Sequence, residues 1–201
     1  MPTTFRSFAI VPAAGKSERM GRDKLTLPWG QTTVFGSLLS AWRASNVDEV
    51  IVVTRPDHER VIAICESAGV SIAIPEHPLP EMKDSVRAAL TYVQSHFAPQ
   101  DMDVWLLAPA DMPLLNSTIV NQVLAAHTPD SPQIVAPAQA GKRGHPVLFP
   151  WPLAKEVDSL GEDEGVNALL KHHSLFTIDC GDDRIHSDLD TPEDYERLRK
   201  L

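Results

Sequence analysis

The chain of 201 residues has only two cysteines, Cys65 and Cys180. Neither lies at a spacing typical of a metal-binding or redox pair, so we expect two reduced, mostly buried thiols. No apolar run approaches the roughly 20 residues that a transmembrane helix needs, and residues 1–7 lack the apolar core of a signal peptide. These absences predict a soluble, cytoplasmic protein with no membrane partner.

Positive charge is also scarce. The 18 lysines and arginines are outnumbered by 27 aspartates and glutamates, which gives a formal net charge of −9. Because a general nucleic-acid-binding protein needs a basic surface to attract phosphate backbones, this balance argues against that class. It is compatible with a nucleotide substrate, since a few local cations and a metal ion are enough to hold a triphosphate.

The first 127 residues alternate between expected strands and expected helices. Such alternation predicts a mostly parallel central sheet with right-handed crossovers and helices on both faces, an α/β fold. The expected strands are 8–11, 49–53, 71–74 and 104–108, and the expected helices are 34–42, 57–67, 85–94 and 119–126. We find no repeat and no domain linker, so we expect one domain over residues 1–201.

The remainder of the chain is less regular. Strands are expected at 134–137, 146–149 and 176–180, with a mobile segment at 139–144 and a helix at 166–172. The final helix has the clearest signals, because Thr191 can cap it and Pro192 suits its first turn.

The loop that follows the first expected strand, residues 12–21, combines small and charged residues. Its small residues let the main chain approach a ligand, and backbone N–H groups there can face phosphate oxygens. The spacing of its glycines fits neither the dinucleotide motif nor the P-loop. By itself the loop is therefore either a phosphate-binding loop or an ordinary charged surface loop. The small residues are Ala13, Ala14 and Gly15, and the nearby cations are Lys16, Arg19 and Lys24.

Three aspartates are candidate metal ligands. Asp111 closely follows the expected strand 104–108, and the carboxyl ends of parallel strands meet at one edge of the sheet. Asp188 and Asp190 alternate in an extended segment, so they can face the same site. Mg²⁺ takes one or two such carboxylates and completes its shell with phosphate and water. The alternatives are a turn aspartate before Pro113 and helix N-terminal charges before Pro192.

The loop as a whole resembles the signature of a known family. The pattern Ala13-Ala14-Gly15-x-Ser17-x-Arg19-Met20-Gly21-x-x-Lys24-Leu25 is similar to the signature loop of nucleotidyltransferases with a GT-A-like Rossmann fold, also described as nucleotide-diphospho-sugar transferase-like. The nearest branch is the molybdenum cofactor cytidylyltransferases and guanylyltransferases. The resemblance covers most of the chain, including Ala110–Pro113, Gly144–Val147 and Asp188–Asp194.

The resemblance implies Mg²⁺-dependent transfer of a nucleotidyl group from a triphosphate to a phosphorylated acceptor, with release of pyrophosphate and no protein nucleophile. The acceptor it implies is molybdopterin cofactor, whose product is handed over to a molybdoenzyme or its chaperone. The implied catalytic residues are Arg19, Lys24 and Asp111. Asp111 is also an implied metal ligand, and the second metal ligand is matched to Asp188 as first choice and to Asp190 as second choice. The implied nucleotide-binding residues are Ala13, Ala14, Gly15, Lys16, Ser17, Arg19, Lys24 and Ser85, and the implied acceptor-binding residues are Gly144 and His145.

The details of the pattern bear on the two substrates. Cytidylyltransferases of the family tend to carry Ala-Ala-Gly, and the methyl group of Ala14 would narrow the pocket against a purine, which favours CTP over GTP. Glu81, Lys83 and Asp84 replace smaller residues of the family, and Asn167 stands where related enzymes have an arginine. The alternatives are therefore a sugar-phosphate or other small-metabolite nucleotidyltransferase, or a non-catalytic nucleotide-binding regulatory protein.

Overall fold

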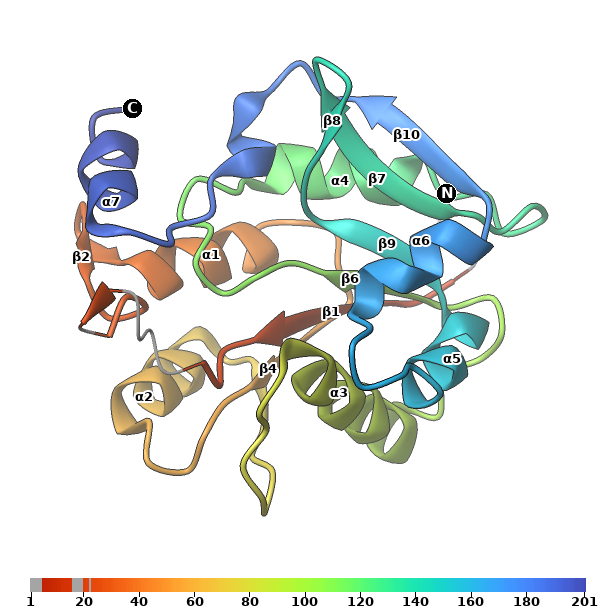
Figure 1. The fold of residues 1–201 in the computed structure, drawn as a ribbon, viewed down its shortest axis with the longest axis horizontal. Coiled ribbons are helices and arrows are strands. Elements are labelled where there is room, and N and C mark those ends of the chain that lie inside the picture. Colours follow the sequence, from red (N-terminus) through yellow and green to blue (C-terminus); the bar gives the residue numbers. More distant parts are fainter. Residues whose placement is uncertain (1–4, 16–19, 22) are drawn as a thin grey trace.

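The computed structural model describes residues 5–15, 20–21 and 23–201, and its core is a twisted sheet (Figure 1). The strands lie in the order β10-β7-β9-β6-β1-β4-β5, and β8 pairs with β7. Strand β9 runs antiparallel to β6 and β7, whereas the β1–β4, β1–β6, β4–β5 and β7–β10 pairs are parallel. The bounds are β1 Ser7–Pro12, β4 Glu49–Val53, β5 Ser71–Ala73, β6 Val104–Leu107, β7 Ile134–Gln139, β8 Lys142–Arg143, β9 Val147–Pro150 and β10 Leu175–Asp179.

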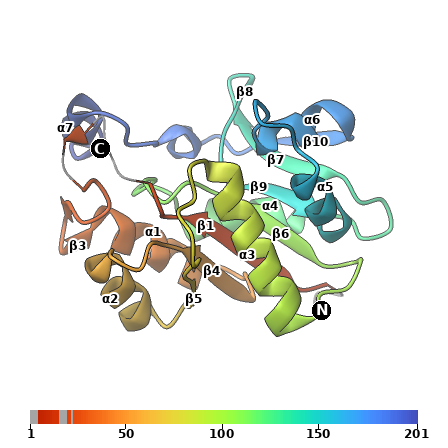
Figure 2. The same ribbon diagram turned by 60° about the horizontal axis from the view of Figure 1, so that its bottom comes forward.

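Alternate side chains of the central strands feed two separate cores, one on each face of the sheet. In β1, Ala9 and Val11 belong to one core, and Phe8 and Ile10 belong to the other. The first core is completed by α1 (Val34–Arg43), α2 (Glu59–Ala68) and α4 (Ser117–Ala125), and the second by α3 (Met82–Phe97), α5 (Ala154–Asp158) and α6 (Leu169–His172). Figure 2 shows α3 lying across the near face of the sheet. The α/β fold with helices on both faces is thus confirmed.

Several short elements differ from the expectation. The segment 139–144, expected to be a mobile connection, contains the end of β7, the turn and the second strand of a β7–β8 hairpin. Ala140 and Gly141 make this turn with φ of 49° and 77°, the left-handed conformation that two-residue hairpin turns require. The expected helix at 166–172 begins as a 3-10 turn and becomes α6 only at Leu169. Helix α5 and the small β2–β3 pair (Pro28–Trp29 and Thr32–Thr33) were not expected, because they are too short to show a period.

The last helix, α7 (Pro192–Leu198), packs against the segment that follows the signature loop (Figure 1). Thr191 caps it in a reciprocal capping box with Asp194, as expected. The hydroxyl of Tyr195 donates a hydrogen bond to the carbonyl of Pro28 at 2.6 Å. A third apolar cluster forms here from Met20, Leu27, Val34, Leu189, Tyr195 and Leu198. Across the described part of the chain, no helix combines the length and apolarity needed to span a membrane.

A buried carboxylate, that of Asp103, links the residues just before β1 to those just before β6, at the amino ends of these two parallel strands. Asp103 is 2% exposed and accepts hydrogen bonds from the amide nitrogens of Arg6 and Gln100 and from the Arg6 guanidinium. Burial alone would raise the pKa of Asp103, but these hydrogen bonds outweigh it, so the pKa lies below its usual value.

We expect Asp103→Asn to lower the free energy of unfolding at pH 7 by about 1 to 3 kcal/mol, because the charge-assisted hydrogen bonds weaken. Since the folded pKa is depressed, this stabilisation is present above the pKa of an unfolded aspartate, near 3.9, and is lost as the pH falls further. The gap between wild type and variant, measured by urea unfolding, should therefore narrow below about pH 4. The exposed Asp101→Asn serves as control, and an equal effect of both substitutions would contradict the assignment.

Candidate active site

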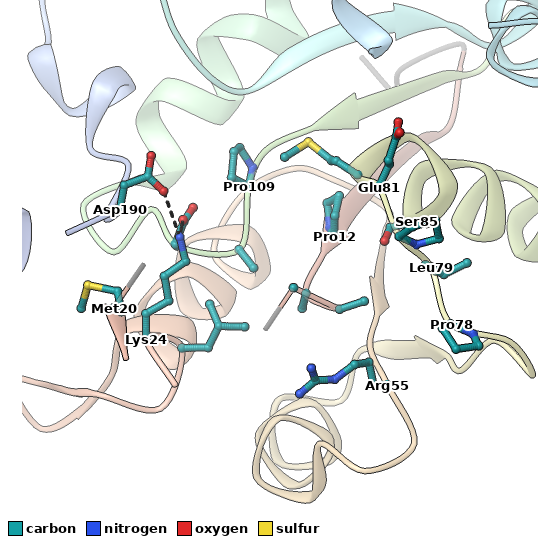
Figure 3. A pocket seen from close by; sticks show the side chains of 18 residues that line it. Pro12, Met20, Lys24, Arg55, Pro78, Leu79, Glu81, Ser85, Pro109 and Asp190 are labelled. Carbon is teal, nitrogen blue, oxygen red and sulfur yellow. Dashed lines mark hydrogen bonds and ion pairs between the residues drawn. The ribbon is translucent and has the colours of Figure 1, made fainter. Parts of the chain in front are cut away.

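A pocket of about 730 Å³ opens at the carboxyl edge of the sheet, where β1, β4 and β6 end (Figure 3). Open α/β sheets bind their ligands at this edge. The residues that line it are Pro12, Ala13, Ala14, Gly15, Met20, Lys24, Leu25, Arg55, Pro78, Leu79, Pro80, Glu81, Met82, Ser85, Pro109, Ala110, Asp111 and Asp190. The loop after β1 and the segment after β6 therefore reach one cavity.

Lys24 joins three segments of this site. Its ammonium group contacts the carboxylate of Asp111, donates to the carbonyl of Leu189 at 2.9 Å and lies 3.2 Å from Asp190 Oδ1. Burial alone would lower the pKa of Lys24, but the carboxylates of Asp111 and Asp190 outweigh it and raise the pKa. Lys24 is therefore a cation near neutral pH, held between two acidic side chains.

Asp111 is the most buried of the three predicted acidic residues and is 7% exposed. Burial raises its pKa, the charge of Lys24 opposes this shift, and the charge of Asp188 adds to it. Among the described residues, nothing donates a hydrogen bond to its buried Oδ1 atom. The backbone carbonyl of Asp111 accepts from the amide of Leu189 at 3.1 Å, which fixes the Asp188–Asp190 segment beside it.

The arrangement fits a magnesium ion. Asp111 and Asp190 already converge on one cation, and Asp111 Oδ1 is a hard oxygen without a partner in the described structure. No group of three or more metal-binding side chains occurs among the described residues. Mg²⁺ does not need one, because it usually takes one or two carboxylates together with substrate phosphate and water.

The two later aspartates occupy different positions. Asp190 lines the pocket and contacts Lys24. Asp188 is not among the lining residues, although its charge acts on both Asp111 and His145. Asp190 therefore contacts Lys24 directly, whereas Asp188, the first choice implied by the family resemblance, acts on Asp111 through its charge, and the choice between them stays a prediction.

The described part of the signature loop forms one wall of the pocket. Ala13 and Ala14 are 2% and 8% exposed, and the Ala13 amide donates to the carbonyl of Val53 at 2.8 Å. That amide holds the loop to β4 and is already used within the fold. A side chain at Gly15 would meet no described atom within 4 Å, which leaves open space above the main chain. Lys16, Ser17 and Arg19 lie outside the described residues.

Ser85 reaches the same pocket from the first turn of α3. The neighbouring residues that differ from the family pattern, Glu81, Lys83 and Asp84, make contacts within the fold. Glu81 and Asp84 form the capping box of α3, and the buried Lys83 donates to the carbonyl of Gly161 at 2.6 Å and to that of Glu162. Lys83 therefore fastens the 161–165 loop to the helix that carries Ser85, a role that the sequence pattern did not predict.

Gly144 and His145 do not line the pocket. A Cβ atom at Gly144 would lie 2.6 Å from the Cβ atom of Ile185, so the packing of Ile185 explains the need for glycine here. His145 Nδ1 lies 3.3 Å from the carbonyl of Leu107. Burial lowers the pKa of His145, against the opposing charge of Asp188, which favours a neutral ring. Neither residue has a described contact that marks it as acceptor-binding.

Sequence reasoning missed two further features of this edge. Arg55, directly after β4, lines the pocket, and His58 Nε2 lies 3.0 Å from Asp23 Oδ2 next to Lys24. No local pattern signals either feature. Cys65 is buried, which raises its pKa to about 12, so it is an inert thiol rather than a nucleophile.

The chain is similar to several curated proteins over nearly its whole length. It is 30% identical over 206 residues to the purine catabolism protein PucB of Bacillus subtilis, covering 94% of this chain and 93% of the relative. It is 26% identical to both the nicotine blue oxidoreductase of Paenarthrobacter nicotinovorans and the molybdenum cofactor cytidylyltransferase of Escherichia coli. These matches cover 94% of each chain for the oxidoreductase and 92% of each chain for the cytidylyltransferase.

A solved structure and a family model also match this chain over most of its length. The structure of Rv0371C from Mycobacterium tuberculosis in complex with manganese matches with a TM-score of 0.75 and 26% identity, covering 97% of this chain and 98% of that one. The family model described as MobA-like NTP transferase domain matches residues 9–176. The chain therefore belongs to the family of MobA-like NTP transferase domains.

Proposed function

We propose that this nucleotidyltransferase transfers CMP in preference to GMP from the triphosphate to a phosphorylated acceptor of the molybdopterin type, with Mg²⁺ as cofactor and pyrophosphate as product. The observation that carries the proposal is the convergence of Lys24, Asp111 and Asp190 beside the signature loop in one pocket. Support for the acceptor comes from the similarity to the molybdenum cofactor cytidylyltransferase. Support for a divalent cation comes from the manganese complex of a structural relative.

The chemistry follows from the charges of the reactants. A phosphate oxygen of the acceptor forms a bond to the α-phosphorus of the triphosphate, and the bond from that phosphorus to the pyrophosphate oxygen breaks. Both reactants are anions, so their repulsion must be offset. Asp111, with Asp190 or Asp188, would hold Mg²⁺, which supplies positive charge to the phosphates when bound.

The protein contributes mainly position and electrostatics. Lys24 places a point charge at the same end of the pocket, and Gly15 leaves room for phosphate oxygens above the main chain. Arg19 would add a second cation, as the family pattern implies. Since Cys65 is inert and the acceptor supplies the attacking oxygen, the reaction needs no protein nucleophile.

A sugar phosphate is the second candidate acceptor. Asn167 lies in the 3-10 turn Val166–Ala168 that follows the loop fastened by Lys83, at the place where related enzymes carry an arginine. The acceptor side therefore has one cation fewer to offer an anionic pterin. Pyrophosphate release, measured with each of the four triphosphates and with molybdopterin or sugar phosphates, separates these candidates. If the protein shows neither turnover nor triphosphate binding with any of these substrates, the proposed enzymatic function and its donor site are rejected.

Asp111→Asn should lower kcat by about 100-fold or more, because a preorganised charge at the reacting phosphates is removed while the shape of the side chain is kept. Pyrophosphate release at saturating triphosphate measures the loss, and circular dichroism checks the fold. Asp130→Asn, at an exposed position, is the matched control. A rate within twofold of wild type would remove Asp111 from the proposed metal site.

Ala14→Gly should raise the ratio of kcat/KM for GTP to that for CTP by up to about tenfold, because removing one methyl group widens the pocket wall by a small volume. Competition between the two triphosphates in a single reaction measures the ratio directly. Ala13→Gly provides a comparison at the neighbouring position of the same loop. An unchanged ratio, or a shift toward CTP, would show that Ala14 does not select the base.

A further inference from the structure

Arg55 occupies a fixed position at the carboxyl end of β4. The preceding residue, Thr54, is fully buried and its amide donates to the carbonyl of Ala73 at 3.2 Å, which continues the pairing with β5. Arg55 is therefore the first residue that leaves the sheet, and it lines the pocket together with Ala13 and Ala14. In Figure 3 Arg55 lies on the opposite side of the drawn lining residues from Asp190, and its guanidinium points away from Pro78.

The guanidinium of Arg55 is well placed to bind a ligand. Its side chain is 27% exposed, and Nε lies 3.2 Å from Asp57 Oδ1. Nε is nevertheless buried without a hydrogen bond of good geometry in the described structure. The ion pair with Asp57 steadies the side chain through Nε, and the structure shows no described acceptor for the two terminal nitrogens.

The order of groups along the pocket places the base near Arg55, an inference that rests on the proposed function. Lys24, Asp111 and Asp190 mark the phosphate end. Figure 3 shows Leu79, Pro78 and Ser85 on the other side of Pro12 from Lys24. A nucleotide whose phosphates lie at the acidic end would extend its base toward this other side of the pocket, which Arg55 and Glu81 also line.

We propose that Arg55 reads the base of the triphosphate through a two-pronged hydrogen bond and thereby selects cytosine and guanine over adenine and uracil. A guanidinium only donates, and its parallel N–H groups match two adjacent acceptors. Cytosine offers such a pair at N3 and O2, and guanine offers one at O6 and N7. Adenine places the N6 amino donor beside N7, and uracil has an N3–H donor between its two carbonyls, so neither presents two adjacent acceptors to the fork.

This assignment adds a second level of selection to the pocket. Arg55 would separate the C and G class from the A and U class, while Ala14 would act within the first class by size. A lysine at position 55 would keep the positive charge but lose the planar fork. Charge and geometry can therefore be tested separately.

The experiment measures dissociation constants by calorimetry for CTP, GTP, ATP, UTP and inorganic tripolyphosphate with Mg²⁺, using wild type, Arg55→Lys, Arg55→Leu and Arg60→Leu. Arg60 is exposed on α2 and provides the matched control. We expect wild type to bind CTP and GTP about 10- to 100-fold more tightly than ATP and UTP, the range for one bidentate contact. Arg55→Lys should reduce that preference to below about threefold while keeping the affinity for tripolyphosphate.

The outcomes separate the possible roles of the residue. Equal weakening of all four nucleotides and of tripolyphosphate would make Arg55 a phosphate contact and overturn the proposal. An unchanged preference in Arg55→Lys would also overturn it, and this variant decides the matter if Arg55→Leu does not fold. Wild-type protein that binds no triphosphate would reject the proposed function itself, a result distinct from tight binding without base preference, which rejects only the role of Arg55.

Discussion

The site depends on the ammonium group of Lys24, which holds together segments that are 87 and 165 residues away along the chain. Asp111 is buried, and a buried carboxylate without a compensating cation is strongly unfavourable. Because Lys24 supplies that cation and also contacts Asp190, the end of β6 and the segment before α7 come to the same edge. The positive charge of Lys24 then offsets the repulsion between the carboxylates of Asp111 and Asp190, so they can lie close together.

The sequence was enough to predict the features that depend on local residue patterns and on the alternation of strands and helices. Strands such as Glu49–Val53 are buried on both faces, so they appear as continuous β-branched runs. The capping chemistry at Thr191 is equally local. The meeting of Asp111 with the signature loop follows from topology, since parallel strands end at one edge. These features are the alternating elements, the pocket edge and most of its described candidate residues.

The features that were missed depend on how segments distant in sequence come together. The sequence showed Lys83 only as the replacement of a smaller residue of the family, yet its ammonium group binds carbonyls of the 161–165 loop. Gly144 was predicted to bind the acceptor, and nothing in the sequence signals that Ile185 packs beside it. Arg55 follows a strand with no motif around it. For Lys83 and Gly144 the partner lies in a segment whose position only the folded chain reveals, and Arg55 is recognised only because the folded chain places it in the pocket.

The packing of α7 against the start of the chain has a consequence for synthesis on the ribosome. All the pocket-lining residues except Asp190 belong to the first 111 residues. An emerging chain therefore acquires most of the cavity wall early, but it lacks the Leu189 carbonyl, Asp190 and the Tyr195 hydroxyl until residues 189–195 have been made. A product in which synthesis stops before Leu189 would keep the contact of Lys24 with Asp111 but would lose those with the Leu189 carbonyl and with Asp190.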